Sequence, residues 1–315
     1  MGLHRRSLAD GPGQRGPAAV KDLLVLARPA QWTKNAFVYA PLLFSGRLFE
    51  GEGFSNAGIA LLCFCAASSA AYVFNDLVDR ERDRLHPLKC DRPLAAGRVG
   101  TPAACALTVA LALVAVGGGL LLGARFTLVV AVFLGLQLLY SSWLKHVPVV
   151  DVVAIAAGFC LRAAAGVVAV NARMSAWLFV CTFFLALFLA LAKRRHEVTL
   201  LAGSATGHRE VLGRYDPELL DKLVTISGLL TMFVYVLYTL SPAVAANLGT
   251  DRMYLTIPFV VFGVFRYLFL VYGRQQGGSP TDVLLGDLPL QAGIALWAAT
   301  VVLLLYSQLA AGAGG

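Results

Sequence analysis

The chain has 315 residues, of which 58% are hydrophobic and 14% are charged, and its mean hydropathy is +0.72. Soluble domains carry about 25% charged residues, so this composition excludes an ordinary soluble enzyme and predicts a membrane protein. The apolar runs are long enough for transmembrane helices rather than barrel strands. The net charge of +8 is explained by membrane topology and anionic lipid, and no nucleic-acid partner is expected.

Residues 1–20 are polar, basic and rich in Gly and Pro, which predicts a disordered cytoplasmic tail. Residues 21–312 are expected to form a single all-α membrane domain. The apolar runs predict about nine transmembrane helices, of which the first is interrupted by Pro29 and Pro41. The predicted spans are 22–46, 56–76, 103–122, 125–142, 149–170, 174–193, 220–240, 253–272 and 288–310.

The 26 Lys and Arg residues are distributed unevenly over the ends of these spans and the segments that join them. Twenty lie on the side of the N-terminus, four lie on the other side, and Arg162 and Arg266 fall within spans. Positive residues favour the cytoplasmic side of a membrane. The sequence therefore predicts a cytoplasmic N-terminus, with residues 77–102 and 194–219 on the same side.

The second span ends in a polar run that begins with Asn75-Asp76 and continues through Asp79 to Asp83. At about 100° per residue, these four side chains lie on one helix face, within an arc of about 100° around the helix axis. Carboxylates crowded beside a low-dielectric layer are unfavourable without a cation. Magnesium prefers such oxygens together with substrate phosphates, so Asp76, Asp79 and Asp83 are predicted as metal ligands and catalytic residues. The alternative is a solvated helix end paired with nearby arginines.

Several basic and polar residues at the same inner ends are candidates for substrate binding. Lys193, Arg194 and Glu197 repeat the geometry of the acidic face with the opposite net charge, which suits a phosphate. Arg162 lies deep in an apolar span, where a charge marks a cavity or an ion pair with an acid on a neighbouring helix. The remaining charges are also explained by interface anchoring. The full set is Lys34, Asn75, Lys89, Arg92, Tyr140, Lys145, Arg162, Lys193, Arg194 and Glu197.

Taken together, these motifs resemble the UbiA superfamily of intramembrane prenyltransferases. The run Asn75–Asp83 fits the family pattern NDxxDxxxD, and Arg92-Pro93 followed by Gly97 fits a further motif. The resemblance implies a nine-helix bundle with a cytoplasm-facing active-site cavity, in which Mg²⁺ helps to ionise a prenyl diphosphate. Typical members carry a second acidic motif at the end of span six, where this chain has Lys193-Arg194-Arg195-His196-Glu197.

In that departure the chain resembles one branch of the superfamily, the decaprenyl-phosphate phosphoribosyltransferases. This resemblance implies Mg²⁺-dependent transfer of a 5-phosphoribosyl group from phosphoribosyl diphosphate to a polyprenyl monophosphate, with release of pyrophosphate. The product would lead to the lipid-linked arabinose donor for the cell wall, and the enzyme would lie in the bacterial plasma membrane. A homo-oligomer is left open.

Two other functions compete with this one. The first is an ordinary prenyltransferase that uses a prenyl diphosphate and an aromatic acceptor, and the missing second acidic motif counts against it. The second is a transporter or phospholipid-binding membrane protein without catalysis. Charges along a pathway through the membrane would be expected for a transporter, whereas here they gather at the inner face.

Overall fold

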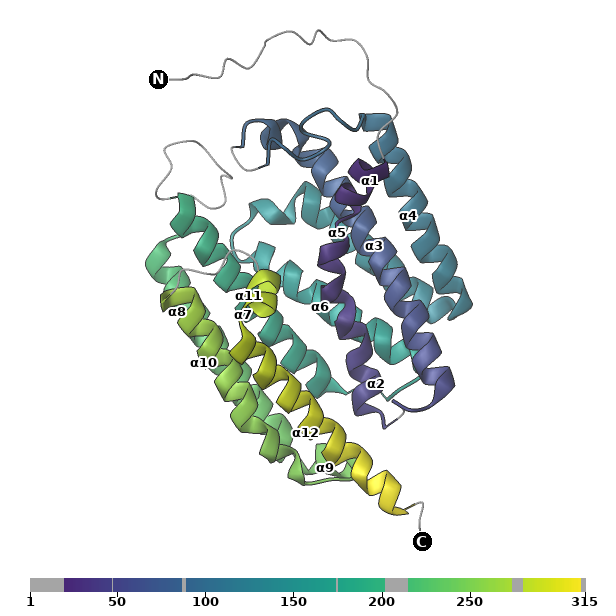
Figure 1. Ribbon diagram of the computed structural model, residues 1–315, viewed down its shortest axis with the longest axis vertical. Coiled ribbons are helices and arrows are strands. Elements are labelled where there is room, and N and C mark those ends of the chain that lie inside the picture. Colours follow the sequence, from purple (N-terminus) through teal and green to yellow (C-terminus); the bar gives the residue numbers. More distant parts are fainter. Residues whose placement is uncertain are drawn as a thin grey trace.

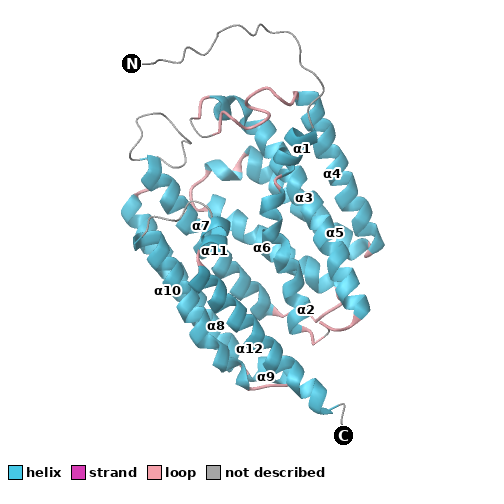
Figure 2. Cartoon of the chain, viewed as in Figure 1, coloured by secondary structure: helices cyan, strands magenta, loops and turns pink. Residues whose placement is uncertain are grey.

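The computed structural model describes residues 20–46, 48–86, 89–173, 175–201, 215–273 and 280–312, and the predicted tail falls almost wholly outside them. All regular structure in these residues is helical, as predicted (Figure 2). The elements are α1 Val20–Ala27, η1 Pro29–Tyr39, α2 Ala40–Phe44, α3 Gly51–Arg84, α4 Thr101–Leu121, α5 Ala124–Ser142, η2 Leu144–His146, α6 Val150–Ala169, α7 Ala176–Leu201, α8 Pro217–Leu240, α9 Pro242–Leu248, η4 Arg252–Thr256, α10 Ile257–Gly273, α11 Pro280–Gly286 and α12 Leu288–Gly312.

Within the described ranges, eight helical segments are long and apolar enough to cross a membrane, against the nine predicted spans. The difference is the first predicted span, which the structure divides into α1, η1 and α2. Arg28 adopts a left-handed backbone with φ 52° and ψ 59°, directly before Pro29. A proline disfavours the helical conformation of the preceding residue and removes a backbone donor, which explains the break.

The bundle has two halves that meet along α6 and α7 (Figure 1). In the first half, α3 packs against α4, α5 and α6 around Phe64, Phe126 and Phe133. In the second half, α7, α8 and α10 pack around Phe188, and α12 contributes Leu290 to the same cluster. In the most apolar part of α3, 67% of the residues are buried, whereas in that of α4 only 17% are buried. Helix α3 is therefore central and α4 is peripheral.

The acid motif is part of α3 itself. This helix has 34 residues, and at about 1.5 Å per residue it extends about 51 Å, well beyond a hydrocarbon layer of about 30 Å. Its last turns therefore carry Asp76, Asp79 and Asp83 past the most apolar part of the span, although all three side chains are buried by neighbouring segments.

A glycine places η1 against α6. A Cβ atom built on Gly166 would lie 2.1 Å from the carbonyl oxygen of Val38, a distance that no packed structure tolerates. The close approach brings Asn35 of η1 beside Arg162 of α6. The broken first segment is thus packed inside the bundle, where its polar residues meet those of α3 and α6.

Candidate active site

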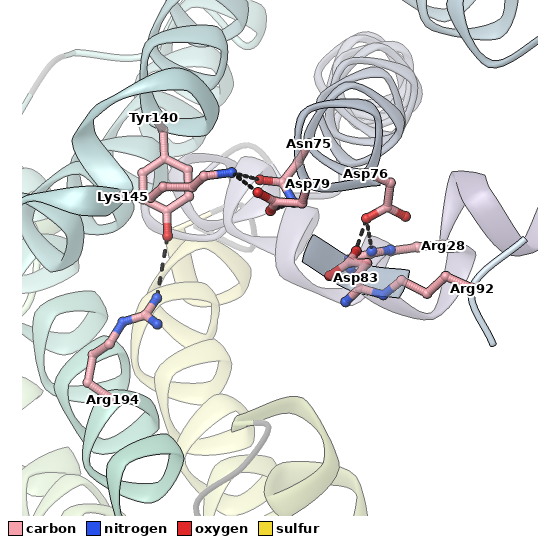
Figure 3. Close-up of polar contacts among 9 residues, drawn as sticks. All are labelled: Arg28, Asn75, Asp76, Asp79, Asp83, Arg92, Tyr140, Lys145 and Arg194. Atoms are coloured by element: carbon pink, nitrogen blue, oxygen red, sulfur yellow. Dashed lines mark hydrogen bonds and ion pairs between the residues drawn. The ribbon is translucent and has the colours of Figure 1, made fainter. Parts of the chain in front are cut away.

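Two of the three motif carboxylates share one arginine. The Arg92 Nη1 atom lies 3.0 Å from Asp76 Oδ1 and 2.6 Å from Asp83 Oδ2 (Figure 3). Arg28 donates a second, short hydrogen bond to the same oxygen of Asp76. Arg28 comes from the break between α1 and η1, and Arg92 comes from the loop after α3. The two carboxylates thus face cations supplied by the segments before and after the helix.

The third carboxylate belongs to a separate group. Lys145 of η2 is only 1% exposed, and its Nζ atom lies 2.7 Å from Asp79 Oδ1 and 3.2 Å from Asn75 Oδ1. Asn75 also donates to Asp79 Oδ2 at 3.1 Å, across one helical turn. Figure 3 shows that Asn75 and Asp79 point toward Lys145, away from the pair around Arg92. The residues of the predicted acidic face therefore form two groups. Asp76 and Asp83 pair with Arg92, and Asn75 and Asp79 contact Lys145.

The acid motif can be tested for its fit to a magnesium ion. Among the described residues, no three His, Cys, Asp or Glu side chains converge into a ready-made metal centre. Magnesium usually takes only one or two carboxylates and completes its shell with water and substrate phosphates. Asp76 and Asp83 already bracket a single cationic nitrogen atom. This pair fits a cation whose remaining ligands come with a phosphorylated substrate.

A cavity of about 260 Å³ opens beside Asp76. Its walls combine the two arginines with the end of α1 and the loop after α3, and Lys89 lies at the start of that loop, partly buried. The lining residues are Val25, Arg28, Asp76, Asp91, Arg92 and Pro93. Guanidinium groups next to a carboxylate pair are suited to an anion that arrives with a divalent cation.

The predicted basic face lies in the C-terminal part of α7, Ala176–Leu201. Arg194 is 3% exposed, and its Nε atom lies 2.9 Å from Asp151 Oδ2 without being aligned for a hydrogen bond. Its guanidinium also pairs with Glu197. It donates to the Tyr140 hydroxyl at 3.4 Å (Figure 3). Lys193 lies 3.8 Å from the other oxygen of Glu197. The structure therefore brings together the residues predicted at this end, with Asp151 as an additional acid.

Asp151 is held by a tyrosine from a distant part of the chain. The Tyr215 hydroxyl donates to Asp151 Oδ1 at 2.7 Å and accepts from the backbone N–H of Val149 at 2.6 Å. Burial raises the pKa of the Tyr215 hydroxyl above its ordinary range, so the group keeps the proton that it donates.

Arg162 is 5% exposed and contacts neutral groups. It donates to Asn35 Oδ1 at 2.8 Å, to the Gly158 carbonyl at 3.0 Å and to Ser68 Oγ at 3.3 Å. Its guanidinium also lies 4.8 Å and 5.1 Å from the centres of two phenylalanine rings. In the described part of the chain, no carboxylate forms an ion pair with it. Lys34 lies on the same segment as Asn35 and is partly buried.

Three residues of this site are missing from the predicted set: Arg28, Asp151 and Tyr215. A charge directly before a proline in an apolar run is a signal for Arg28, and an acid in the first turn of an apolar span is a signal for Asp151. Tyr215 carries no such signal, because it contacts Asp151 across 64 residues of sequence.

Comparison with known proteins adds to this geometry. The sequence model of the UbiA prenyltransferase family matches residues 38–281. A decaprenyl-phosphate phosphoribosyltransferase of Corynebacterium glutamicum is 32% identical over 309 residues, which is 96% of this chain and 92% of that protein. The enzyme of the same name from Mycobacterium tuberculosis H37Rv is 34% identical over 278 residues, 87% of this chain and 91% of that protein.

Solved structures share the fold at lower sequence identity. A UbiA homologue from Archaeoglobus fulgidus, bound to DMAPP and Mg²⁺, superposes with a TM-score of 0.69 and 20% identity. The match covers 90% of this chain and 99% of that chain. The helical bundle predicted from the sequence is therefore confirmed.

Proposed function

Because this chain belongs to the UbiA prenyltransferase family of multi-pass membrane transferases, we propose that it transfers a 5-phosphoribosyl group from phosphoribosyl diphosphate to a polyprenyl monophosphate such as decaprenyl phosphate. Pyrophosphate is the second product. The relatives named decaprenyl-phosphate phosphoribosyltransferase support this choice, since they are 32–34% identical over most of the chain.

The observation that carries the proposal is the basic end of α7. A second magnesium-bound diphosphate would need carboxylates that are not already paired with cations, whereas at this end Glu197 contacts both Lys193 and Arg194, and Asp151 lies 2.9 Å from Arg194. A phosphate monoester is attracted directly by such cations, and hydrogen bonds to charged groups contribute about 1.5–3 kcal/mol each. The basic face therefore suits a lipid that enters as a monophosphate.

The sugar diphosphate belongs on the acidic side in this scheme. Asp76 and Asp83 would hold Mg²⁺, with Asp79 and Asn75 beside them. When bound, this ion neutralises charge on the diphosphate leaving group. Arg92 faces the same cavity and can donate to phosphate oxygens, and Lys89 at the start of its loop adds positive charge.

The reaction breaks the bond between C1 of the ribose and the diphosphate oxygen, and it forms a bond from C1 to an oxygen of the lipid phosphate. C1 passes through an oxocarbenium-like state, as in glycoside cleavage. The lipid phosphate is already ionised at neutral pH, so no strong general base is required. Lys193 and Arg194 would hold this nucleophile, Tyr140 and Lys145 would line the space between the two faces, and Lys34 and Arg162 would add positive charge.

The cellular setting follows from the same proposal. The active site would face the cytoplasm of a bacterial plasma membrane, where phosphoribosyl diphosphate is available, and the product would feed the lipid-linked arabinose donor for cell-wall arabinan. The excess of Lys and Arg on the side of the acid motif supports this orientation.

A transfer assay with purified protein tests the proposal. Radiolabelled phosphoribosyl diphosphate, Mg²⁺ and decaprenyl phosphate are incubated with the protein, and label is expected in the organic phase. A parallel reaction contains prenyl diphosphate and an aromatic acid. Product from the second reaction alone would refute the proposal and leave the aromatic prenyltransferase function in its place.

A further inference from the structure

The loop between α5 and α6 contains an unfavourable backbone conformation. Val149 has φ 69° and ψ −44°, in a region that a β-branched residue rarely adopts. This residue is the N-cap of α6, and the same loop contains η2 with the buried Lys145. A contact that holds Val149 in place therefore also fixes the start of α6 and the position of Lys145.

Tyr215 makes that contact. It is 5% exposed and lies just before α8, and its hydroxyl accepts from the Val149 N–H at 2.6 Å. The same hydroxyl donates to Asp151 Oδ1 at 2.7 Å, and Asp151 is fully buried. One hydroxyl group thus uses both its donor and its acceptor capacity at the first turn of α6.

The two hydrogen bonds of the Tyr215 hydroxyl act on different parts of the site, the acid motif and the basic face. Through Val149, the hydroxyl restrains the loop whose Lys145 lies 2.7 Å from Asp79. Through Asp151, it restrains the carboxylate whose other oxygen lies 2.9 Å from Arg194. The acid motif and the basic face are otherwise carried by different helices, α3 and α7.

We propose that Tyr215 is a positioning residue for the transfer reaction, and that it sets Lys145 against the acid motif and Arg194 at the acceptor side. This inference rests on the proposed function for its kinetic consequences. Its structural consequence, a restrained loop at 143–151, is independent of which substrates the protein uses.

Tyr215→Phe removes only the hydroxyl, and Tyr267→Phe is the matched control. Tyr267 is a 3% exposed tyrosine of the same hydrophobic cluster, and its hydroxyl has no hydrogen-bond partner among the described residues. Amide hydrogen exchange of residues 143–151 is expected to accelerate about tenfold in Tyr215→Phe, because a buried hydrogen bond is lost. It should stay unchanged in Tyr267→Phe. The value of kcat/KM should fall at least about tenfold in the first variant only.

A second substitution separates positioning from general stability. Val149→Gly makes the left-handed conformation acceptable without the tyrosine hydroxyl. On this background, Tyr215→Phe should cost less than about threefold in kcat, because the loop no longer depends on the hydrogen bond. A merely structural tyrosine would cost the same on both backgrounds, and that result would overturn the inference.

Asp151→Asn tests the contact between Asp151 and Arg194, and it provides an independent test if Tyr215→Phe does not fold. The asparagine keeps an oxygen for Tyr215 and loses the charge that faces Arg194. The KM for decaprenyl phosphate should rise about tenfold while that for phosphoribosyl diphosphate changes less than about twofold. Unchanged hydrogen exchange in Tyr215→Phe, or equal effects of Asp151→Asn on both KM values, would refute the positioning role. Wild-type protein without transfer activity would refute the proposed function instead, and the exchange measurement would still test Tyr215.

Discussion

Replacing Lys145 by methionine removes the cation that faces Asp79 and leaves a carboxylate in the protein interior. Methionine keeps much of the length and volume of lysine, so the main loss is the charge. We expect the Lys145→Met variant to be strongly destabilised, because Lys145 is 1% exposed and Asp79 is 8% exposed. An uncompensated buried charge is much less favourable than either a buried pair or no charge at all.

The magnitude follows from the geometry of the pair. Across the 2.7 Å between Nζ and Oδ1, the Coulomb attraction is about 6 kcal/mol at an effective dielectric constant of about 20. Desolvation of both groups offsets much of this attraction. Removal of one partner from such a pair typically costs about 3–5 kcal/mol in the free energy of unfolding. At roughly 2 °C per kcal/mol for a large chain, the melting temperature should fall by about 6–10 °C.

Thermal unfolding in detergent micelles measures this change. The thiols of Cys63 and Cys65 are buried in the native protein and react with a thiol-specific dye when the bundle opens. Lys222→Met is the matched control, since Lys222 is exposed on α8 and its loss should shift the melting temperature by less than about 1 °C. The double variant Asp79→Asn/Lys145→Met removes both charges and should regain at least about half of the lost stability.

If Lys145→Met melts within about 1 °C of the wild type, the ion pair does not stabilise the interior as described. If the double variant is less stable than Lys145→Met, the carboxylate of Asp79 is held by other partners, and the division of the acid motif into two groups is wrong.

The acid motif, the buried arginine and the topology give further predictions. Asp76→Asn should lower turnover at least about 100-fold, measured by pyrophosphate release, with little change in melting temperature. In the same assay, EDTA should abolish wild-type activity until Mg²⁺ is restored. Arg162→Met and Arg162→Lys should each lower the free energy of unfolding by about 2–3 kcal/mol, because neither side chain can make all three hydrogen bonds of Arg162 to neutral oxygens. If both variants unfold like the wild type, these hydrogen bonds do not stabilise the bundle. On a background without native cysteines, Phe49→Cys should react with an impermeant maleimide in intact cells and Glu81→Cys only after permeabilisation, and the reverse pattern would overturn the orientation.

The length of the apolar runs accounts for most of what the sequence predicted correctly about the fold. The predicted span 220–240 is helix α8, Pro217–Leu240, and the predicted span 253–272 corresponds to η4 and α10. Such runs are long and uniformly apolar, so length alone identifies them. Periodicity also placed Asn75 one turn before Asp79, where the two side chains are hydrogen-bonded.

The same periodicity could not divide the acidic face between its neighbours. An arc of about 100° is wide enough to meet two packing partners, and those partners come from segments far away in the sequence. Arg28 reaches Asp76 across 48 residues, and Lys145 reaches Asp79 across 66. Which cation faces which acid depends on the packing of η1, η2 and the loop after α3, and a single sequence contains no direct record of that packing.

Arg162 shows why a buried charge was easier to locate than to explain. A charge within an apolar span is unfavourable in any fold, so the sequence predicted either a cavity or an acidic partner. The structure stabilises the guanidinium with three neutral oxygens and two aromatic rings. Gly158 and Phe159 lie one turn before Arg162 on α6, whereas the other three groups come from η1, α3 and α5, and nothing in the sequence connects them with Arg162.

The balance of charge in the site follows from these contacts. Asp76, Asp79 and Asp83 are each paired with a cation, and Asp151 faces Arg194, whereas Arg162 has only neutral partners in the part of the chain that the structure describes. The charge of Arg162 is therefore not neutralised by any carboxylate among the described residues. A metal ion bound to Asp76 and Asp83 would add further positive charge, so it is favourable only together with an anion of high charge. A diphosphate substrate meets that requirement, and a phosphorylated acceptor would supply additional negative charge.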